Sequence, residues 1–287
     1  MNRNTIIQTL LAKQALPLEN HLQEAIRNGQ IQQQYVSFPG KKKNENSQEF
    51  ANRVTKASER FQFVQVLFNG ENHYVAFGTS GPIITKFGRF SLVPGQVVGG
   101  RWGVHYFLFS PNFETALQQK EIFIRLDSGC VSGQVFNDIT CDCREQFEIA
   151  LRICARDGAG IVVHIPGHDG RGWAQFKLAN QQLMDECDLD TVAAARLFYG
   201  DELHIDQRTY MESVIILRAF GFGERHIFNM ATNNPRKVGA FVALGMNLKG
   251  SQSIVAQQVN PLLEANLKAK SEKWNHNFNN TVKNQKA

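Results

Sequence analysis

Three cysteines lie close together near the middle of the chain. Cys130, Cys141 and Cys143 are eleven and two positions apart, in a sequence that holds five cysteines in all. A Cys-x-Cys pair does not readily close a disulfide on itself, because neighbouring side chains of an extended segment point apart. Both sulfurs can still reach one ion from a tight turn. Three thiolates would leave one tetrahedral position of Zn²⁺ open, which is typical of a catalytic centre that activates water.

Spacing alone leaves two other interpretations open. The three cysteines can be buried small side chains without a ligand role, and a fourth ligand such as His164 or His168 would close the metal site. The N-terminal sequence lacks the continuous apolar core of a signal peptide, so we expect a cytoplasmic protein. In that reducing compartment, clustered cysteines bind metal or do chemistry more often than they form disulfides.

The composition is that of an ordinary globular protein, with 43% hydrophobic and 20% charged residues. Lys and Arg number 31 against 26 Asp and Glu, for a net charge of +5. This charge suits an anionic small molecule such as a phosphorylated compound, but it is too small and too dispersed to indicate a nucleic acid. No stretch approaches the roughly 20 apolar residues that cross a bilayer. We therefore expect neither a nucleic-acid partner nor a membrane.

The elements that must position the cysteines change in type along the chain. Apolar residues at helical spacing predict one or two amphipathic helices within residues 1–35. Aromatic and branched runs at 61–68, 105–109 and 121–126 predict strands. From 144 onward, an apolar helical stripe that ends at Asp157-Gly158 opens an alternating pattern. The later elements are a buried strand at 160–165, helices up to about 187 and across 209–220, a strand at 226–231 and a helix after Pro235.

This pattern predicts an α/β fold, with a β-rich N-terminal half followed by alternating strands and helices and a helical N-terminal extension. We expect three parts. Residues 1–85 form the extension, with helices, a linker and the first strands. Residues 86–250 form the zinc domain, and residues 251–287 form a polar C-terminal tail.

The cysteines belong to a longer series of motifs. The series is Ser128-Gly129-Cys130, Cys141-Asp142-Cys143, Gln146-Phe147-Glu148, Gly170-Arg171-Gly172, Leu189-Asp190-Thr191-Val192, Asp206-Gln207-Arg208, Thr232-Asn233-Asn234-Pro235-Arg236-Lys237 and a C-terminal segment at 267–273. In this order the motifs resemble the GTP cyclohydrolase II family, which opens the imidazole ring of GTP at the head of riboflavin synthesis. The resemblance runs from roughly 86 to 276, and residues 1–85 have no counterpart in it.

The resemblance implies a zinc-dependent hydrolase that acts on a cyclic amidine. Metal-activated water attacks the carbon between the two imidazole nitrogens of GTP, and formate and pyrophosphate leave. Cys130, Cys141 and Cys143 are then the ligands of one zinc ion per chain. The resemblance also implies a magnesium ion on the nucleotide phosphates, and a homodimer.

The same resemblance gives roles to other residues. Asp206 would orient Arg208, which attacks or clamps the α-phosphate; a guanidinium is better suited to the clamp than to the attack. The positions that hold the nucleotide are Arg125, Gln146, Arg171, Thr191, Thr232 and Lys237. Plainer interpretations are a surface ion pair for Asp206 and Arg208, and a solvated helix face for Lys237.

Several departures from the family pattern fall in the expected pocket. Counted without gaps, the family's catalytic tyrosine falls on Gln182, and the basic pair before it falls on Leu178 and Asn180. An amide cannot replace a phenol as a proton donor at useful pH. The glutamate of the family's Ser-Glu-Cys motif is Gly129 here. The chain is therefore expected to be a divergent family member.

The loop before Arg171 is also one residue longer than in the family. Within it, Asp169 could accept the N–H donors of a guanine edge. His168 could supply an acid or base near neutral pH in place of the missing phenol, or be a plain loop histidine. Three functions follow: a divergent GTP-opening enzyme, a relative that opens another ring such as that of a uracil nucleotide, or a catalytically inactive nucleotide-binding regulatory module.

Overall fold

The computed structural model describes residues 18–31, 43–58, 61–111, 118, 121–200, 205–256 and 259–278. Residues 1–17 and 32–35 of the predicted N-terminal helices lie outside these ranges. Within them, α2 begins at Leu18, and its Leu22 and Ala25 pack against Phe63 and Ala76 of the sheet.

Nine strands in the described part of the chain form one sheet. They are β1 Gln62–Phe68, β2 Glu71–Phe77, β3 Gly81–Thr85, β4 Gly88–Val97, β5 His105–Phe109, β6 Glu121–Asp127, β7 Gly160–His164, β8 Ile227–Ala231 and β9 Asn247–Gln252. Their order is β1-β2-β4-β5-β7-β6-β8-β9, with β3 paired to β4. Pairs as far as β5 and β7 are antiparallel, whereas β7, β6, β8 and β9 run parallel. The predicted boundary at residue 85 falls between two paired strands, β3 and β4.

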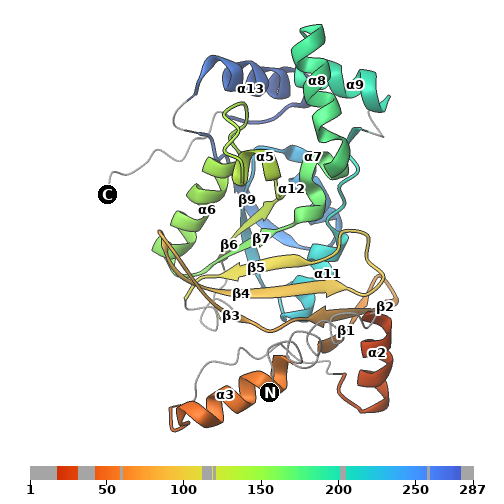
Figure 1. The fold of residues 1–287 in the computed structure, drawn as a ribbon, viewed down its shortest axis with the longest axis vertical. Coiled ribbons are helices and arrows are strands. Elements are labelled where there is room, and N and C mark those ends of the chain that lie inside the picture. Colours follow the sequence, from red (N-terminus) through yellow and green to blue (C-terminus); the bar gives the residue numbers. More distant parts are fainter. Residues whose placement is uncertain are drawn as a thin grey trace, which may run out of the picture.

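The helices gather at the two ends and on the faces of this sheet. They are α2 Leu18–Arg27, α3 Ser47–Ser58, α5 Val131–Gln134, α6 Cys143–Asp157, α7 Asp169–Gly172, α8 Lys177–Cys187, α9 Thr191–Tyr199, α11 Met211–Ala219, α12 Pro235–Ala243 and α13 Pro261–Trp274, with 3₁₀ turns at Pro166–His168 and Ala174–Phe176. Figure 1 shows α8, α9 and α13 at one end of the molecule, and α2 and α3 at the opposite end.

The central strands are buried on both faces, since successive side chains of a strand point to opposite sides. On β7, Ile161 and Val163 join a large core that includes residues of α11 and α12. Val162, between them, joins a second core with Leu151 and Ile153 of α6. This packing fixes where the strands end, and hence where the loops that follow them meet.

The predicted fold class is confirmed, and so is the alternation of strands and helices after residue 144. The helix predicted there is α6, and it ends as expected at Gly158, which has a left-handed φ of 71° and donates its N–H to the carbonyl of Cys154. Helices α3, α9 and α13 and strand β9 were not predicted from the sequence. Among the described helices, none combines the length and the apolar character that a bilayer crossing requires.

Candidate active site

Three parallel strands bring the predicted site residues to one edge of the sheet. The segment at 128–130 follows β6, which ends at Asp127, the loop at 166–171 follows β7, and the segment at 232–237 follows β8. In open α/β sheets, ligands bind beyond the carboxyl ends of the strands. One pocket lies at this edge, and every catalytic, substrate-binding and metal-ligating residue predicted above lines it.

The three clustered thiols have the spacing of a zinc centre. The Sγ atoms of Cys130, Cys141 and Cys143 all lie within 4.8 Å of one another, and those of Cys130 and Cys141 are 3.8 Å apart. A tetrahedral ion with Zn–S bonds of about 2.3 Å separates its sulfurs by roughly 3.8 Å. Cys130 immediately precedes α5 and Cys143 begins α6, so two helix starts hold the cluster. The donor set therefore fits Zn²⁺.

Gly133 leaves the space that these sulfur atoms occupy. This role of Gly133 was not predicted from the sequence. A Cβ atom at this position of α5 would lie 2.4 Å from the Sγ of Cys141 and 3.4 Å from that of Cys130. Real side chains do not approach so closely, so only glycine fits there. A glycine three residues after the first cysteine is the signal that could have revealed this constraint.

Hydrogen bonds among the three thiols lower the pKa of one of them and raise the pKa of the other two. Hydrogen bonds from Cys141 and Cys143, followed by the charge of Lys177, lower the pKa of Cys130 far below that of a free thiol. The bond to Cys130 raises the pKa of Cys141 to about 11, and the pKa of Cys143 is raised well above its usual range for the same reason. Zinc binding would displace the protons that these two thiols keep.

Neither histidine considered as a fourth ligand joins the cluster. The group of potential metal ligands in the described part of the chain consists of the three thiols. The Nδ1 of His164 lies 2.8 Å from Oδ2 of Asp127. The ring of His168 lies edge-on to Trp102 and Tyr210. If these thiols held a zinc ion, the described residues would leave its fourth position to water or substrate.

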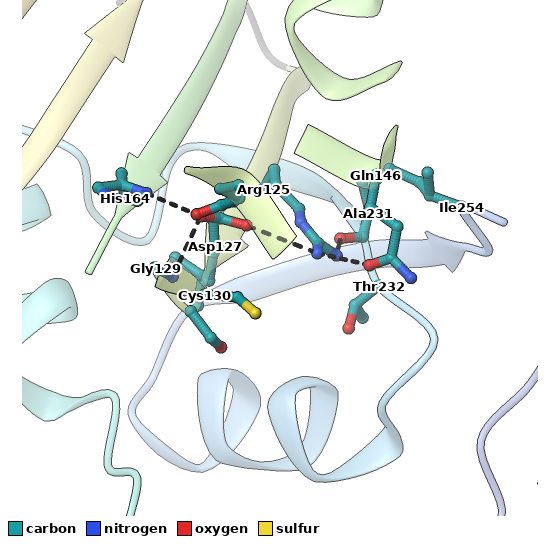
Figure 2. A network of polar contacts seen from close by, with 12 residues as sticks. Arg125, Asp127, Gly129, Cys130, Gln146, His164, Ala231, Thr232 and Ile254 are labelled. Atoms are coloured by element: carbon teal, nitrogen blue, oxygen red, sulfur yellow. Dashed lines mark hydrogen bonds and ion pairs between the residues drawn. The ribbon is translucent and has the colours of Figure 1, made fainter. Parts of the chain in front are cut away.

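Asp127 organises the turn that carries Cys130. Its Oδ2 accepts hydrogen bonds from the backbone N–H of Gly129 at 3.2 Å and from Nε2 of Gln134 at 2.8 Å, beside His164. Figure 2 shows Gly129 and His164 converging on Asp127 at the end of β6. Although burial opposes the charge, the hydrogen bond from His164 and the charge of Arg125 lower the pKa of Asp127. The carboxylate is therefore an anionic anchor for the turn that carries Cys130.

Gly129, at the position of the family's glutamate, has a structural explanation. Its φ is +58°, and a Cβ there would lie 2.6 Å from Cα of Pro166 and 2.8 Å from the carbonyl oxygen of Ile165. The loop after β7 thus occupies the space that a side chain at 129 would need.

Arg125 and Gln146 form one chain of contacts along the pocket wall. Nη2 of Arg125 donates to Oε1 of Gln146 at 2.7 Å, and Nη1 donates to the carbonyl of Ala231 at 3.1 Å. Nε2 of Gln146 in turn donates to Oδ2 of Asp142 at 2.5 Å. Arg125 is 5% exposed, so it is a buried pocket residue rather than a charge that merely ends a strand.

Arg208 and Asp206 form a buried ion pair next to the turn that carries Cys130. Nη1 of Arg208 donates to Oγ of Ser128 at 3.0 Å, and Nζ of Lys237 donates to the same oxygen at 3.2 Å. The side chains of Asp206 and Arg208 are each 13% exposed, which excludes a solvated surface ion pair. Lys237 is 4% exposed, so it does not lie on a solvated helix face.

The positively charged side chains near Ser128 repel one another. Burial, together with the nearby guanidiniums of Arg125 and Arg208, lowers the pKa of Lys237 well below its usual range. Burial and the charge of Arg208 lower the pKa of Arg171 to about 10. Lys237 lies in the first turn of α12, where the N–H of Arg236 donates to Oδ1 of the N-cap residue Asn234 and the N–H of Lys237 donates to the Asn234 carbonyl. A bound phosphate would relieve this repulsion.

The loop at Arg171 turns sharply to place its side chain. Gly170, Arg171 and Gly172 all have left-handed φ values, of 56°, 64° and 88°. Nη2 of Arg171 donates to Oγ1 of Thr191 at 3.0 Å, and its guanidinium lies 4.3 Å from the ring centroid of Trp274 in α13. The C-terminal tail thus contributes a helix to the pocket. Thr232, after β8, accepts a hydrogen bond from the N–H of Asn234 at 3.1 Å.

The carboxylate of Asp169 accepts hydrogen bonds from three groups of the protein. Its Oδ1 accepts from the N–H of Gly170 at 2.8 Å and from Nζ of Lys177 at 3.2 Å, while Oδ2 accepts from the N–H of Val131 at 3.3 Å. Both carboxylate oxygens are therefore used within the protein. Lys177 was not anticipated from the sequence, although it also lines the pocket.

The pocket face of α8 differs from the expectation based on Gln182. That side chain is exposed, whereas Lys177, Asn180, Gln181 and Met184 line the pocket. These four positions follow one helical face. The phenol that lines the pocket is instead Tyr199, which stacks on Trp173 and donates to the carbonyl of Phe176 at 3.5 Å.

His168 is enclosed rather than free in its loop. The residue is fully buried, and neither ring nitrogen has a hydrogen-bond partner among the described residues. Burial, followed by the charges of Arg208 and Lys237, lowers its pKa to about 2. The imidazole is therefore neutral at physiological pH in this arrangement.

Comparison with known proteins agrees with this geometry. A family model described as GTP cyclohydrolase II matches residues 83–253. A GTP cyclohydrolase-2 from Streptomyces coelicolor is 35% identical over 56% of this chain and 70% of its own length. One from Campylobacter fetus is 27% identical over 67% of this chain and 90% of its own. A riboflavin biosynthesis protein RibBA from Aquifex aeolicus is 33% identical over 56% of this chain.

The chain spans 38% of the length of the Aquifex aeolicus protein. The matched region contains β4 to β9 and the whole sequence from the thiol cluster to Lys237. The chain therefore belongs to the GTP cyclohydrolase II family.

Proposed function

We propose that the chain is a zinc-dependent hydrolase that opens the base ring of a nucleotide, with GTP as the first candidate and formate and pyrophosphate as products. One observation carries the proposal. Ser128 accepts hydrogen bonds from Arg208 and Lys237, and Cys130 of the thiol cluster follows two residues later. Two residues span at most roughly 7 Å, so a phosphate bound at Ser128 lies within a nucleotide's length of the metal site.

The residues divide the work between two ends of the pocket. Cys130, Cys141 and Cys143 would hold the zinc ion, which when bound supplies water activated near neutral pH. Arg208, oriented by Asp206, clamps the α-phosphate, and Lys237 and Arg171 neutralise the rest of the phosphate charge. Arg125, Gln146, Thr191 and Thr232 also line the pocket and would contact the rest of the nucleotide.

A second candidate substrate is supported by the engaged Asp169. Guanine recognition by this carboxylate would have to share oxygen atoms that already accept three hydrogen bonds within the protein. No phenol comes from the pocket face of α8. These two observations favour a different base, such as that of a uracil nucleotide, opened by the same zinc chemistry.

Family membership supports further parts of the proposal. They are a magnesium ion on the nucleotide phosphates, a homodimer and a cytoplasmic location. The sedimentation coefficient of the purified full chain would test the dimer.

The substrate is tested by incubating the zinc-loaded protein with GTP and with UMP separately, while formate, pyrophosphate and ring absorbance are followed. We expect ring opening of one nucleotide, and formate only from GTP. A Cys141→Ser variant, matched in size, should lose both zinc and turnover. Thermal stabilisation by a nucleotide without any product would instead support the inactive binding module.

A further inference from the structure

Lys177 connects the metal-binding turn with the loop after β7. As the first residue of α8, it directs its Nζ to the Sγ of Cys130 at 2.9 Å, to Oγ of Ser132 at 2.6 Å and to Oδ1 of Asp169 at 3.2 Å. The three hydrogens of its ammonium group match these three acceptors. Its side chain is 27% exposed, so the contacts form in a partly buried place.

The surrounding backbone is shaped for this lysine. A Cβ added to Gly170 would lie 3.0 Å from Cβ of Lys177, which is tighter than most real contacts. Glycine at this left-handed position therefore lets the stem of Lys177 pass close to the loop. The contact with Cys130 belongs to the packing of the loop and is not made by a free surface side chain.

The contact matters because of the charge of the centre. Three thiolates around one divalent cation leave a net negative charge, which makes the metal a weaker Lewis acid. A hydrogen bond from an ammonium group withdraws electron density from the sulfur that accepts it. Hydrogen bonds to cysteine sulfur tune metal centres in this way, and groups that contact metal ligands commonly set metal affinity.

We infer that Lys177 is a positioning residue of the zinc centre, which holds the Cys130 thiolate by a charge-assisted hydrogen bond and reduces its electron donation to the metal. The inference rests on the proposed zinc site. It assigns Lys177 no contact with the reacting atoms. It also explains the contact of Asp169 with Lys177, since the same ammonium group donates to both Asp169 and Cys130.

The test uses the full-length protein loaded with Co²⁺, whose sulfur-to-metal charge-transfer band reports the energy of the thiolate electrons. In Lys177→Met we expect this band at longer wavelength than in wild type, because the lone-pair electrons of Cys130 are no longer stabilised. Zinc affinity, measured by competition with a chromophoric chelator, should fall by about 10-fold, because the loss of the hydrogen bond that holds Cys130 in place outweighs the stronger electron donation of its sulfur. Lys177→Arg keeps the charge and should return the band towards its wild-type position.

Lys268→Met is the matched control, because Lys268 is 72% exposed on α13 and pairs with Glu272. It should leave both the band and the affinity unchanged. A Lys177→Met band at the wild-type wavelength would overturn the inference while leaving the zinc site intact. A wild-type protein without any thiolate band would overturn both the inference and the proposed zinc function. Comparing the melting temperatures of the metal-free variants separates a folding defect from these outcomes.

Discussion

Arg208 grips Asp206 by both carboxylate oxygens, with Nε 2.8 Å from Oδ1 and Nη2 2.6 Å from Oδ2. The remaining terminal nitrogen, Nη1, donates to Ser128 at 3.0 Å. One edge of the planar guanidinium is thus fixed by the carboxylate, and the other is directed to the turn that carries the metal ligands. A phosphate that bound there would meet a cation whose orientation is already set.

Replacing Arg208 by lysine should keep the positive charge but lose the fixed orientation of the cation. A compact ammonium group cannot hold both oxygens of Asp206 and reach Ser128 at the same time. We expect turnover to fall by roughly 10²–10³-fold, with zinc content unchanged. Arg156→Lys, at an exposed ion pair with Asp157, is the matched control and should keep full activity. If Arg208→Lys turned over nucleotide at close to the wild-type rate, the clamp role would be wrong.

The same pair gives a pH dependence of stability with a definite sign. Although burial opposes the charge, the hydrogen bond from Arg208 lowers the pKa of Asp206 from 3.8 to about 2. The native state therefore holds this proton less tightly than the unfolded chain. Its contribution, about 2 kcal/mol, is present above pH 4 and is lost as the pH falls towards 2.

Urea unfolding of the metal-free protein at pH 7, 4 and 3 would measure this effect. Asp206→Asn, which cannot titrate, should be less stable than wild type at pH 7, and the difference should shrink between pH 4 and 3. A difference in unfolding free energy that stayed constant over this range would show that Asp206 does not carry the titration.

The features of this site that depend on a local sequence pattern could be predicted. The ordered motifs, rather than spacing alone, predicted Cys130, Cys141 and Cys143 as metal ligands, and the structure brings these thiols together. The period of the α6 stripe predicted the helix that presents Cys143. The strands that end at Asp127 and His164 could be predicted because buried parallel strands are nearly continuous apolar runs. These features need only neighbouring residues to be recognised.

The parts that could not be predicted depend on contacts between distant segments. Lys177 reaches Cys130 only because Gly170, Arg171 and Gly172 take consecutive left-handed conformations, which no simple period encodes. The polar α13 buries Leu263 and Ala269 and places Trp274 over Arg171, so its helical pattern is weak. A helix that covers a polar pocket does not show the apolar stripe of one that covers a core.

A Gly133→Ala variant should remove the metal without touching a ligand. The added Cβ would lie 2.4 Å from Sγ of Cys141, so that sulfur or helix α5 must move. We expect the zinc content, measured by elemental analysis, to fall far below one ion per chain. Gly239→Ala is the matched control, because its Cβ would meet nothing within 4 Å. In the middle of α12 this control should stabilise the protein by up to about 1 kcal/mol. Full zinc in Gly133→Ala would contradict the tight fit.

Restoring the family's tyrosine at position 182 should not restore a catalytic phenol. Gln182 is exposed, and the pocket face of α8 runs through Lys177, Asn180 and Gln181 instead. A tyrosine at 182 would therefore place its hydroxyl in solvent, and kcat for the accepted nucleotide should stay at the wild-type value. Gln181→Tyr, one position earlier, should obstruct the pocket and raise KM. If Gln182→Tyr strongly accelerated GTP ring opening, then α8 would have to rotate in the working enzyme, and the pocket face described here would not be the one that meets the substrate.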